Sequence, residues 1–539
     1  MSQPEFIIRT EDILLDDILS LYVGTEKDDE IVEVIKSSSP LVLVGSRGTG
    51  KSFLFRVAEQ QQSQDFDSTR VLPVYVSFIK SSLVQATNAD AFQSWMLARL
   101  CSRIIRELYR RGLLAAALPA AELLSGGGDT KLGGNTRLEE IVAQFEESYR
   151  NPGQQINADA VPHVESFKDA IQDICDALNI KRFNILFDEA AHIFRPEQQR
   201  QFFTLFRDLR FPYLTCNAAV YPGVTAYGDT FEPAHDARFE YLNRDISDSN
   251  YLMQMRDIIF RQADAELQAN IEKNGENFDA LAFAVSGNPR LLLKTISFAS
   301  SLRTAEVTSV IKDFYRSSIW AEHSGLSEKY PGHRSLIDWG RDFIEKVVVP
   351  DALEKNALWA EEGKPERTCY FWINRDVPET VREALRILSY TGIVTLIDKG
   401  VVATRRQIGE RYAVNIGCLS APEATPIRFI TDLRRGLSIK RFTEYGQSHS
   451  SFDDLENIAE GVGQLDGAEA IQQQLARSVE ELDLTVHQKQ SLRSLEIETI
   501  GQALTSTEAQ FQQAYYIGPK RSRRIMNVVT AAVLEYLSG

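Results

Sequence analysis

The sequence predicts an α/β fold, with a parallel β-sheet covered by helices on both faces and smaller domains after it. Strand-like apolar runs alternate with helix-compatible stretches from about residue 41 to residue 220. A glycine-rich loop joins the first of these strands to its helix, and from about residue 250 to residue 322 the pattern is helical. At 539 residues the chain is too long for a single hydrophobic core. We therefore expect roughly two to four domains.

The most informative stretch is the glycine loop, residues 45–52, which follows the apolar run Leu41–Val44. Its residues are Gly45, Ser46, Arg47, Gly48, Thr49, Gly50, Lys51 and Ser52. They match the pattern G-x-x-x-x-G-K-[ST], whose glycines let backbone N–H groups point at an anion before the positive end of the next helix. We expect Lys51 to contact the β- and γ-phosphates of ATP and the Ser52 hydroxyl to bind Mg²⁺. The alternative, a glycine turn that happens to precede Lys-Ser, is disfavoured by the strand and helix on either side.

A later apolar strand ends in two carboxylates, Asp188 and Glu189. Ligands of open α/β sheets lie at the carboxyl ends of the strands, where the glycine loop also falls. We expect Asp188 to hold the magnesium shell and Glu189 to activate a water. On its own, such a run is equally typical of a buried strand that ends in an acidic turn. The end of the fourth strand should also carry a polar catalytic residue facing the γ-phosphate; Asn217 and Tyr221 are both candidates, and the pattern does not choose between them.

Arginines occupy further positions near the expected site. Residues 286–290 form a helix stop and restart, in which Pro289 suits the first turn of the next helix and Arg290 projects from its N-terminus. Arg290 is therefore expected to reach back to the γ-phosphate, the alternative being a capping turn with a surface arginine. Arg207 and Arg210 lie on the helix before the fourth strand and either point to a neighbouring subunit's nucleotide or are solvated.

Composition disfavours several classes of protein. The formal net charge of −16 argues against adhesion of the whole surface to nucleic acid or anionic membrane, so any nucleic-acid contact must be local. The five cysteines form no C-x-x-C pair and have no histidine cluster nearby, which disfavours a disulfide framework or a zinc site. No run approaches the length of a membrane span, and the first residues lack the pattern of a signal peptide. We expect a cytoplasmic protein without membrane partners.

The glycine loop, the acidic pair and residues 287–290, in this order and spacing, resemble the initiator and origin-recognition branch of the AAA+ ATPases. They are similar in particular to bacterial origin-recognition-like ATPases, over roughly residues 10–320. The resemblance implies a Mg²⁺-dependent ATPase core, a helical lid that carries a second sensor in Arg290, and often a winged-helix domain, with which residues 330–420 are compatible. The chain departs from the family in lacking an assignable arginine finger. We expect a homo-oligomer on nucleotide binding.

The C-terminus resembles a different module. Residues 479–525 are similar to the C-terminal domain of the bacterial RNA polymerase α subunit, a small helical unit built on a helix-hairpin-helix. The hairpin's Ile-Gly turn exposes backbone N–H groups that can bind a DNA phosphate without base readout. The residues expected to contact DNA are Gly518, Lys520, Arg521, Arg523 and Arg524. The alternative is a protein-docking module with a solvated basic face.

These observations predict five segments. They are a P-loop ATPase core at residues 1–248, a helical lid at 249–325, a winged-helix-like domain at 326–420, a linker or helical region at 421–475 and a helix-hairpin-helix domain at 476–539. The function predicted is that of an ATP-binding and ATP-hydrolysing AAA+ switch that engages DNA through its C-terminal modules. The alternative is a nucleotide-gated signalling or scaffold subunit of a bacterial antiphage defence system, which docks a partner effector protein.

Overall fold

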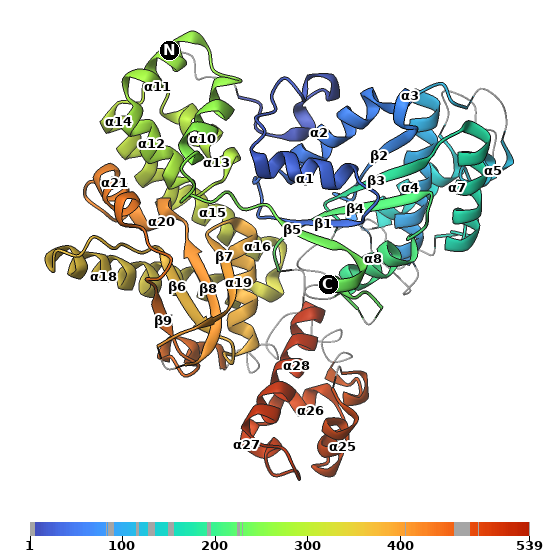
Figure 1. The fold of residues 1–539 in the computed structure, drawn as a ribbon. Coiled ribbons are helices and arrows are strands. Elements are labelled where there is room, and N and C mark those ends of the chain that lie inside the picture. Colours follow the sequence, from blue (N-terminus) through green and yellow to red (C-terminus); the bar gives the residue numbers. More distant parts are fainter. Residues whose placement is uncertain are drawn as a thin grey trace.

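The structure is a computed structural model of the chain (Figure 1). It describes residues 6–81, 84, 91–114, 118–127, 135–148, 156–190, 196–223, 227–228, 230–404, 406–456, 475–482 and 484–537. Along the described chain, a first domain with the large sheet is followed by a helical second domain, a third domain with a smaller sheet, and a C-terminal module. None of the described helices combines the length and the apolar character needed to cross a membrane.

The first domain is built on a five-stranded sheet of order β2-β3-β4-β1-β5. Its strands are β1 (Leu41–Val44), β2 (Val71–Ser77), β3 (Arg182–Asp188), β4 (Leu214–Val220) and β5 (Arg238–Tyr241). All neighbouring strands pair in parallel, which confirms the predicted α/β fold. The sequence pattern does not predict β5, because this short edge strand is largely exposed and has no continuous apolar run.

Helices cover both faces of this sheet. Successive residues of a strand face opposite sides, so Leu41 and Leu43 pack on α1 and α2, whereas Val42 and Val44 belong to the core under α4, α7 and α8. The helices of this domain are α1 (Glu26–Lys36), α2 (Lys51–Gln64), α3 (Phe66–Thr69), α4 (Ala91–Arg110), α5 (Pro119–Leu123), α6 (Arg137–Glu147), α7 (Val164–Leu178), α8 (Pro196–Asp208) and α9 (Pro233–Asp236). Because β4 lies between β1 and β3, the carboxyl ends of these three strands meet at one edge.

The second and third domains share one hydrophobic core, formed by residues from Tyr251 to Leu455 together with Tyr221, which follows β4. The helices of the second domain are α10 (Tyr251–Phe260), α11 (Ala265–Lys273), α12 (Gly275–Ala284), α13 (Pro289–Phe298), α14 (Thr304–Asp313) and α15 (Ile319–Ser324). This agrees with the all-helical pattern of that part of the sequence. Since their apolar side chains interlock, we expect the two domains to move as one body.

The third domain contains a four-stranded mixed sheet of order β7-β8-β6-β9. Its elements are α16 (Leu326–Lys329), α17 (Arg334–Phe343), α18 (Val349–Glu361), β6 (Tyr370–Asn374), α19 (Glu379–Thr391), β7 (Val394–Val402), β8 (Ile408–Val414), α20 (Ile416–Ser420), α21 (Pro426–Gly436), β9 (Thr443–Tyr445) and α22 (Asp453–Glu456). β7 and β8 pair antiparallel.

The segment 421–475, expected to be a linker or helical region, contains the helix α21 and the strand β9. β9 pairs in parallel with β6, and Ile430 and Leu433 of α21 are buried in the shared core. Residues up to 456 therefore belong to the third domain. Residues 457–474 lie outside the described part of the chain.

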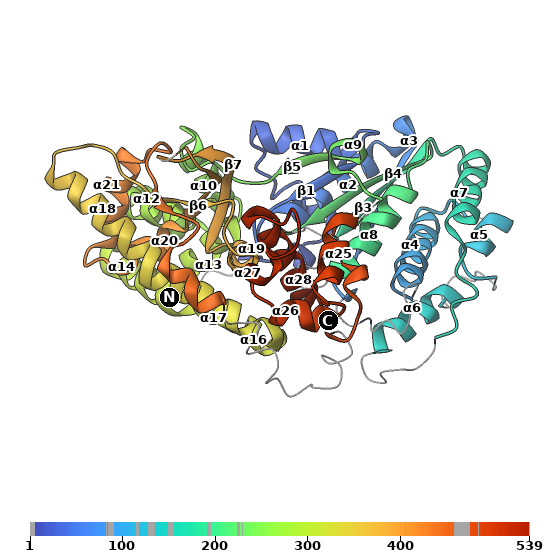
Figure 2. The same cartoon turned by 90° about the horizontal axis from the view of Figure 1, so that it is seen from below.

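The C-terminal module has a core of its own, formed by residues from Val479 to Val533. Its helices are α25 (Val486–Ser494), α26 (Ile500–Thr505), α27 (Glu508–Phe511) and α28 (Pro519–Leu537). α28 packs against α19 of the third domain and against the 3₁₀ turn Pro331–His333. Figure 1 shows the module below the first and third domains, and in Figure 2, which is seen from below, it lies in front of their junction.

Buried histidines make the stability of the second and third domains depend on pH. His323 is fully buried, its Nε2 lies 3.1 Å from the Ile337 carbonyl oxygen, and burial lowers its pKa to about 4. His333 is 1% exposed and its pKa is also lowered to about 4 by burial. Both are therefore neutral when folded, whereas an unfolded histidine binds a proton below about pH 6.5. The contribution of each neutral histidine to the free energy of unfolding is fully present above that pH. It is lost as the pH falls toward 4, by about 3 kcal/mol for each histidine.

This expectation is checked by urea unfolding at pH 7 and pH 4.5. His323→Gln removes one titrating group, so it should reduce the loss of stability between the two pH values by about 2 kcal/mol. An equal loss in the variant and the wild type would show that His323 is not responsible.

Candidate functional site

The glycine loop connects β1 to α2 in a backbone conformation that requires its glycines. Gly48 and Gly50 have φ values of +86° and +107°, a region that residues with a Cβ rarely adopt. A Cβ on Gly48 would also lie 2.7 Å from Oδ1 of Asn288 and 2.9 Å from Cβ of Arg290. The loop is therefore shaped both by its own conformation and by close contact with the start of α13.

Lys51 is the first residue of α2 and is buried beneath the loop. Its Nζ donates to the carbonyl oxygens of Gly45 at 2.6 Å and of Ser46 at 3.1 Å. The same Nζ lies 4.3 Å from the ring centroid of Tyr221. Burial lowers the pKa of Lys51 to about 8, against the opposing effect of Glu189 and Asp188. The ammonium is thus a poorly solvated cation, which favours an interaction with a multiply charged anion.

Asp188 ends β3, and Glu189 follows it in a turn. Asp188 is 3% exposed and accepts hydrogen bonds from the Tyr75 hydroxyl and, at 3.0 Å, from the Glu189 N–H. Glu189 has a φ of +54°, which is uncommon for a residue with a side chain and indicates a conformation imposed by its surroundings. Its Oε1 accepts a hydrogen bond of 2.6 Å from the Tyr221 hydroxyl. Burial, with Asp188 nearby, raises the pKa of Glu189.

The strand register decides between the two candidates at the end of β4. Asn217 lies opposite Leu41, the first residue of β1, and donates to the Ile35 carbonyl oxygen at 3.2 Å and to Asn184 at 2.8 Å. The structure therefore does not bring Asn217 to the loop, and its catalytic assignment is corrected. Tyr221 directly follows β4 and contacts both Lys51 and Glu189.

Arg290 comes to the loop from the second domain. Asn288 caps α13 by accepting from the Leu291 N–H and also donates to the Arg47 carbonyl oxygen at 2.8 Å. The backbone N–H of Arg290 faces the Gly48 carbonyl oxygen at 3.5 Å, and its Nε donates to the Ile8 carbonyl oxygen at 3.3 Å. The predicted helix restart is found, and it is anchored on the glycine loop.

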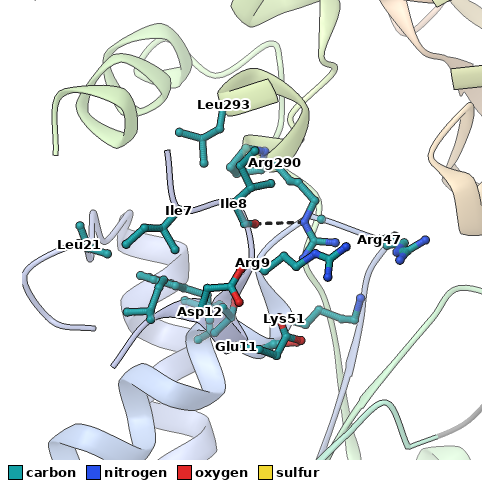
Figure 3. A pocket seen from close by; sticks show the side chains of 18 of the residues that line it. Ile7, Ile8, Arg9, Glu11, Asp12, Leu21, Arg47, Lys51, Arg290 and Leu293 are labelled. Atoms are coloured by element: carbon teal, nitrogen blue, oxygen red, sulfur yellow. Dashed lines mark hydrogen bonds between the residues drawn. The ribbon is translucent and has the colours of Figure 1, made fainter. Parts of the chain in front are cut away.

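One cavity of about 460 Å³ lies beside the loop. Figure 3 shows the residues from Ile7 to Asp12 between Leu293 of the second domain and Lys51 of the first. The cationic side chains that line the cavity are Arg9, Arg47, Lys51, Arg244 and Arg290, and its apolar lining includes Ile7, Ile13, Leu21, Phe53, Ile258 and Leu293. The size is within the usual range for small-molecule sites. A cationic part beside an apolar part suits a ligand with charged groups at one end and a flat apolar ring system at the other.

A magnesium ion fits the oxygen atoms present here. Ser52 and Asp188 both line the cavity, and they offer a hydroxyl and a carboxylate, which are ligands that Mg²⁺ prefers. Among the described residues, no group of three or more His, Cys, Asp and Glu side chains is placed to hold a metal. An ion would therefore take its remaining ligands from phosphate and water, as Mg²⁺ commonly does.

The other predicted side chains lie away from the cavity. Arg207 is paired with Asp208 and donates to the Thr230 carbonyl oxygen, and Arg210 lies 3.6 Å from Asp236. In the C-terminal module, the start of α28 and the residue before it expose Gly518, Lys520, Arg521 and Arg524. Arg523 differs, because it forms an ion pair with Glu508 of α27.

Contacts from the third domain to the glycine loop are a feature that sequence analysis does not predict. The Ser46 hydroxyl donates to the Ser389 carbonyl oxygen at 2.9 Å, and the Arg47 N–H faces the Tyr390 carbonyl oxygen at 3.4 Å. From the second domain, Glu322 of α15 forms a 3.1 Å ion pair with Arg47. No local sequence pattern predicts these contacts, because the partners are more than 270 residues apart.

No protein-family model and no curated protein matches the chain. Among solved structures, it is similar to the Aeropyrum pernix ORC1 protein in complex with DNA, with 14% identity, 78% of this chain and 95% of that chain covered, and a TM-score of 0.32. It is also similar to the Aeropyrum pernix ORC2 protein in ADPNP–ADP complexes, with 11% identity, 77% and 95% coverage, and a TM-score of 0.31. At these values neither similarity assigns a role to any residue of this chain.

Proposed function

We propose that this protein is an ATP-binding and ATP-hydrolysing switch of the AAA+ type that engages DNA through its C-terminal modules. The observation that carries the nucleotide part is the cavity itself. The glycine loop, Lys51 and the acidic pair meet there at the carboxyl ends of neighbouring parallel strands, and an apolar lining adjoins them. The triphosphate would lie against the loop and the cationic side chains, and the adenine against the apolar residues.

Each residue of the site has a chemical task in this proposal. Lys51 and the N–H groups of the loop bind the β- and γ-phosphates. Ser52 and Asp188 would hold Mg²⁺, which supplies charge neutralisation of the phosphates when bound. Glu189 takes a proton from the attacking water, and Tyr221 orients its carboxylate. Arg290 stabilises negative charge on the γ-phosphate from the second domain, so hydrolysis alters a contact that joins two domains.

The DNA part rests on the C-terminal module. The turn around Gly518, at the start of α28, carries three exposed cations, Lys520, Arg521 and Arg524. Phosphate contacts of this kind give weak sequence preference and strong salt dependence. Because Arg523 is paired with Glu508, we leave it out of the proposed contact set and assign it to the packing of α27 on α28. The β7–β8 hairpin of the third domain is the proposed wing of a winged helix.

The DNA proposal predicts a salt-dependent effect of the hairpin cations. Lys520→Ala, Arg521→Ala and Arg524→Ala together should abolish stimulation of ATP turnover by duplex DNA and leave the basal rate unchanged. Each lost phosphate contact should reduce the slope of log affinity against log salt by about 0.9. The measurement is steady-state ATP hydrolysis with and without duplex DNA at two salt concentrations, together with DNA binding by fluorescence anisotropy.

The matched control removes three exposed cations elsewhere, Lys27, Lys273 and Arg303. It should keep both binding and stimulation, because local charge and not net charge is what matters. An equal loss of DNA binding and of stimulation in both triple variants would mean that DNA binding depends only on the overall charge of the protein. Binding and stimulation that survive in the hairpin variant would remove the module from the DNA interface.

A second candidate function is a nucleotide-gated scaffold that docks a partner effector, as in an antiphage defence system. It is favoured by two adjacent tyrosines beside the hairpin, Tyr515 and Tyr516, whose exposed fractions are 83% and 68%. Exposed tyrosines next to arginine are typical of protein interfaces. This function would replace DNA engagement if duplex DNA neither binds the module nor alters turnover.

A further inference from the structure

We propose that the C-terminal end of α19 governs ATP hydrolysis through the ring of Tyr390, which fixes Tyr221 and thereby the position of Glu189. The inference rests on the proposed ATPase function and goes beyond it. It makes Tyr221 and Tyr390 positioning residues, and it places the third domain in direct control of the hydrolytic carboxylate.

The first step is the contact of α19 with the glycine loop. The last carbonyl groups of a helix have no partner within the helix. In α19 the Ser389 carbonyl oxygen accepts from the Gly392 N–H at 3.3 Å and also from the Ser46 hydroxyl at 2.9 Å, and the Tyr390 carbonyl oxygen faces the Arg47 N–H at 3.4 Å. Gly392, with a φ of +77°, ends the helix at this point in the left-handed conformation typical of helix ends. The loop thus accommodates the end of a helix from another domain.

The second step is the arrangement around Tyr221. Its ring meets the Tyr390 ring edge to face, with centroids 4.8 Å apart and planes at 77°. The Lys51 ammonium lies 4.3 Å from the Tyr221 ring centroid. The Tyr221 hydroxyl donates a hydrogen bond to Oε1 of Glu189 at 2.6 Å. Held by a ring, a cation and a carboxylate, the 7% exposed Tyr221 side chain has one orientation that satisfies all three.

α19 also packs against the turn that follows Tyr221. Gly223 has a φ of +92°, and a Cβ there would lie 3.0 Å from Cβ of Arg386 on α19. Arg386 is in turn fixed by ion pairs with Glu379 and Glu383 of the same helix. α28 of the C-terminal module packs against α19 as well. One helix therefore contacts the glycine loop, the segment that carries Tyr221, and the module proposed to bind DNA.

A merely structural role for Tyr390 predicts something different. If the ring only fills space, its loss should lower stability and leave the kinetic constants of the folded enzyme unchanged. If it positions Tyr221, its loss should lower kcat with little effect on KM, because the carbonyl groups that contact the loop belong to the backbone and are retained.

The test compares Tyr390→Leu with Tyr390→Phe in the full chain. Phe keeps the ring contact, so kcat should stay within about twofold of the wild type. Leu loses it, so kcat should fall about three- to tenfold with KM within about twofold, as expected for the loss of one aromatic pair. Tyr445→Leu is the matched control, because Tyr445 also makes an edge-to-face contact in the third domain, with Phe343 at 5.2 Å.

A double-mutant cycle shows whether Tyr390 acts on hydrolysis through Tyr221. Tyr221→Phe removes the hydroxyl that donates to Glu189, and adding Tyr390→Leu to it should lower kcat no further. Additive effects, an unchanged or raised kcat in Tyr390→Leu, or an equal fall in Tyr445→Leu would overturn the inference while the ATPase function stands. A wild-type chain that binds ATP without hydrolysing it would overturn the proposed hydrolytic function, and the inference with it.

Discussion

Replacing Glu189 by Gln should leave ATP binding intact and lower kcat by about 10²–10⁴-fold. Glutamine has the shape of glutamate and keeps an oxygen that can accept from the Tyr221 hydroxyl, which lies 2.6 Å from Oε1 in the structure. It cannot take a proton from water. Titration of ATP by calorimetry and release of phosphate in the steady state, measured on the same preparation, separate the two effects.

The control for this variant is Glu276→Gln, which changes an exposed glutamate of α12 in the same way. It should bind and hydrolyse ATP as the wild type does. If Glu189→Gln retained wild-type turnover, Glu189 would not be the base, and the turn that gives it a φ of +54° would need another explanation.

Replacing Lys51 by Met should weaken ATP binding by about 10- to 100-fold, which corresponds to the loss of a charge-assisted contact of about 1.5–3 kcal/mol. The free energy of unfolding without nucleotide should not fall. Lys51 is a buried cation held by two carbonyl oxygens, so an apolar side chain of similar length removes a desolvated charge. Equilibrium binding of ATP and urea unfolding of the same variant measure the two quantities.

Lys27→Met provides the comparison, because Lys27 is an exposed lysine of α1. It should change neither quantity. A Lys51→Met protein that binds ATP as tightly as the wild type would remove the glycine loop from phosphate binding, since no other lysine lines the described cavity.

The glycine loop and the strands beside it could be predicted because their signals are local. A run such as Leu41–Val44 is apolar on both faces, as a strand buried between two helix layers must be. The restart at Pro289 has equally local causes, since Asn288 caps the helix and proline suits its first turn. The resulting placement of Arg290 beside Gly48 follows from these rules and from the order of the elements.

Position along a strand was harder to predict than the strand itself. Asn217 and Tyr221 both lie at β4, and only the register shows that Asn217 is level with the beginning of β1 while Tyr221 is level with the loop. An asparagine in an apolar strand suggests a polar task, but here the task is structural. Its amide nitrogen joins Asn184 and the end of α1.

The contact of the third domain with the loop has no local signal at all. Ser46 and Ser389 are 343 residues apart, and the sequence around neither residue predicts contact with the other. Residues 421–456 also lack a local signal for their place in the fold. Their sequence is compatible with a linker, and only the pairing of β9 with β6 shows that they belong to the sheet of the third domain. Such features depend on how domains pack, and they are also the features that suggest regulation.

The proposed function requires that ATP is bound at the glycine loop and hydrolysed there. The most direct test is a single-turnover experiment with enzyme in excess over ATP, comparing the wild type and Lys51→Met in Mg²⁺ and in EDTA. We predict ADP and phosphate from the wild type with Mg²⁺ alone, none above the uncatalysed rate with EDTA, and markedly slower product formation by the variant at the same concentrations. Bound ATP that stays intact on the wild type, or equal hydrolysis by Lys51→Met, would contradict the account.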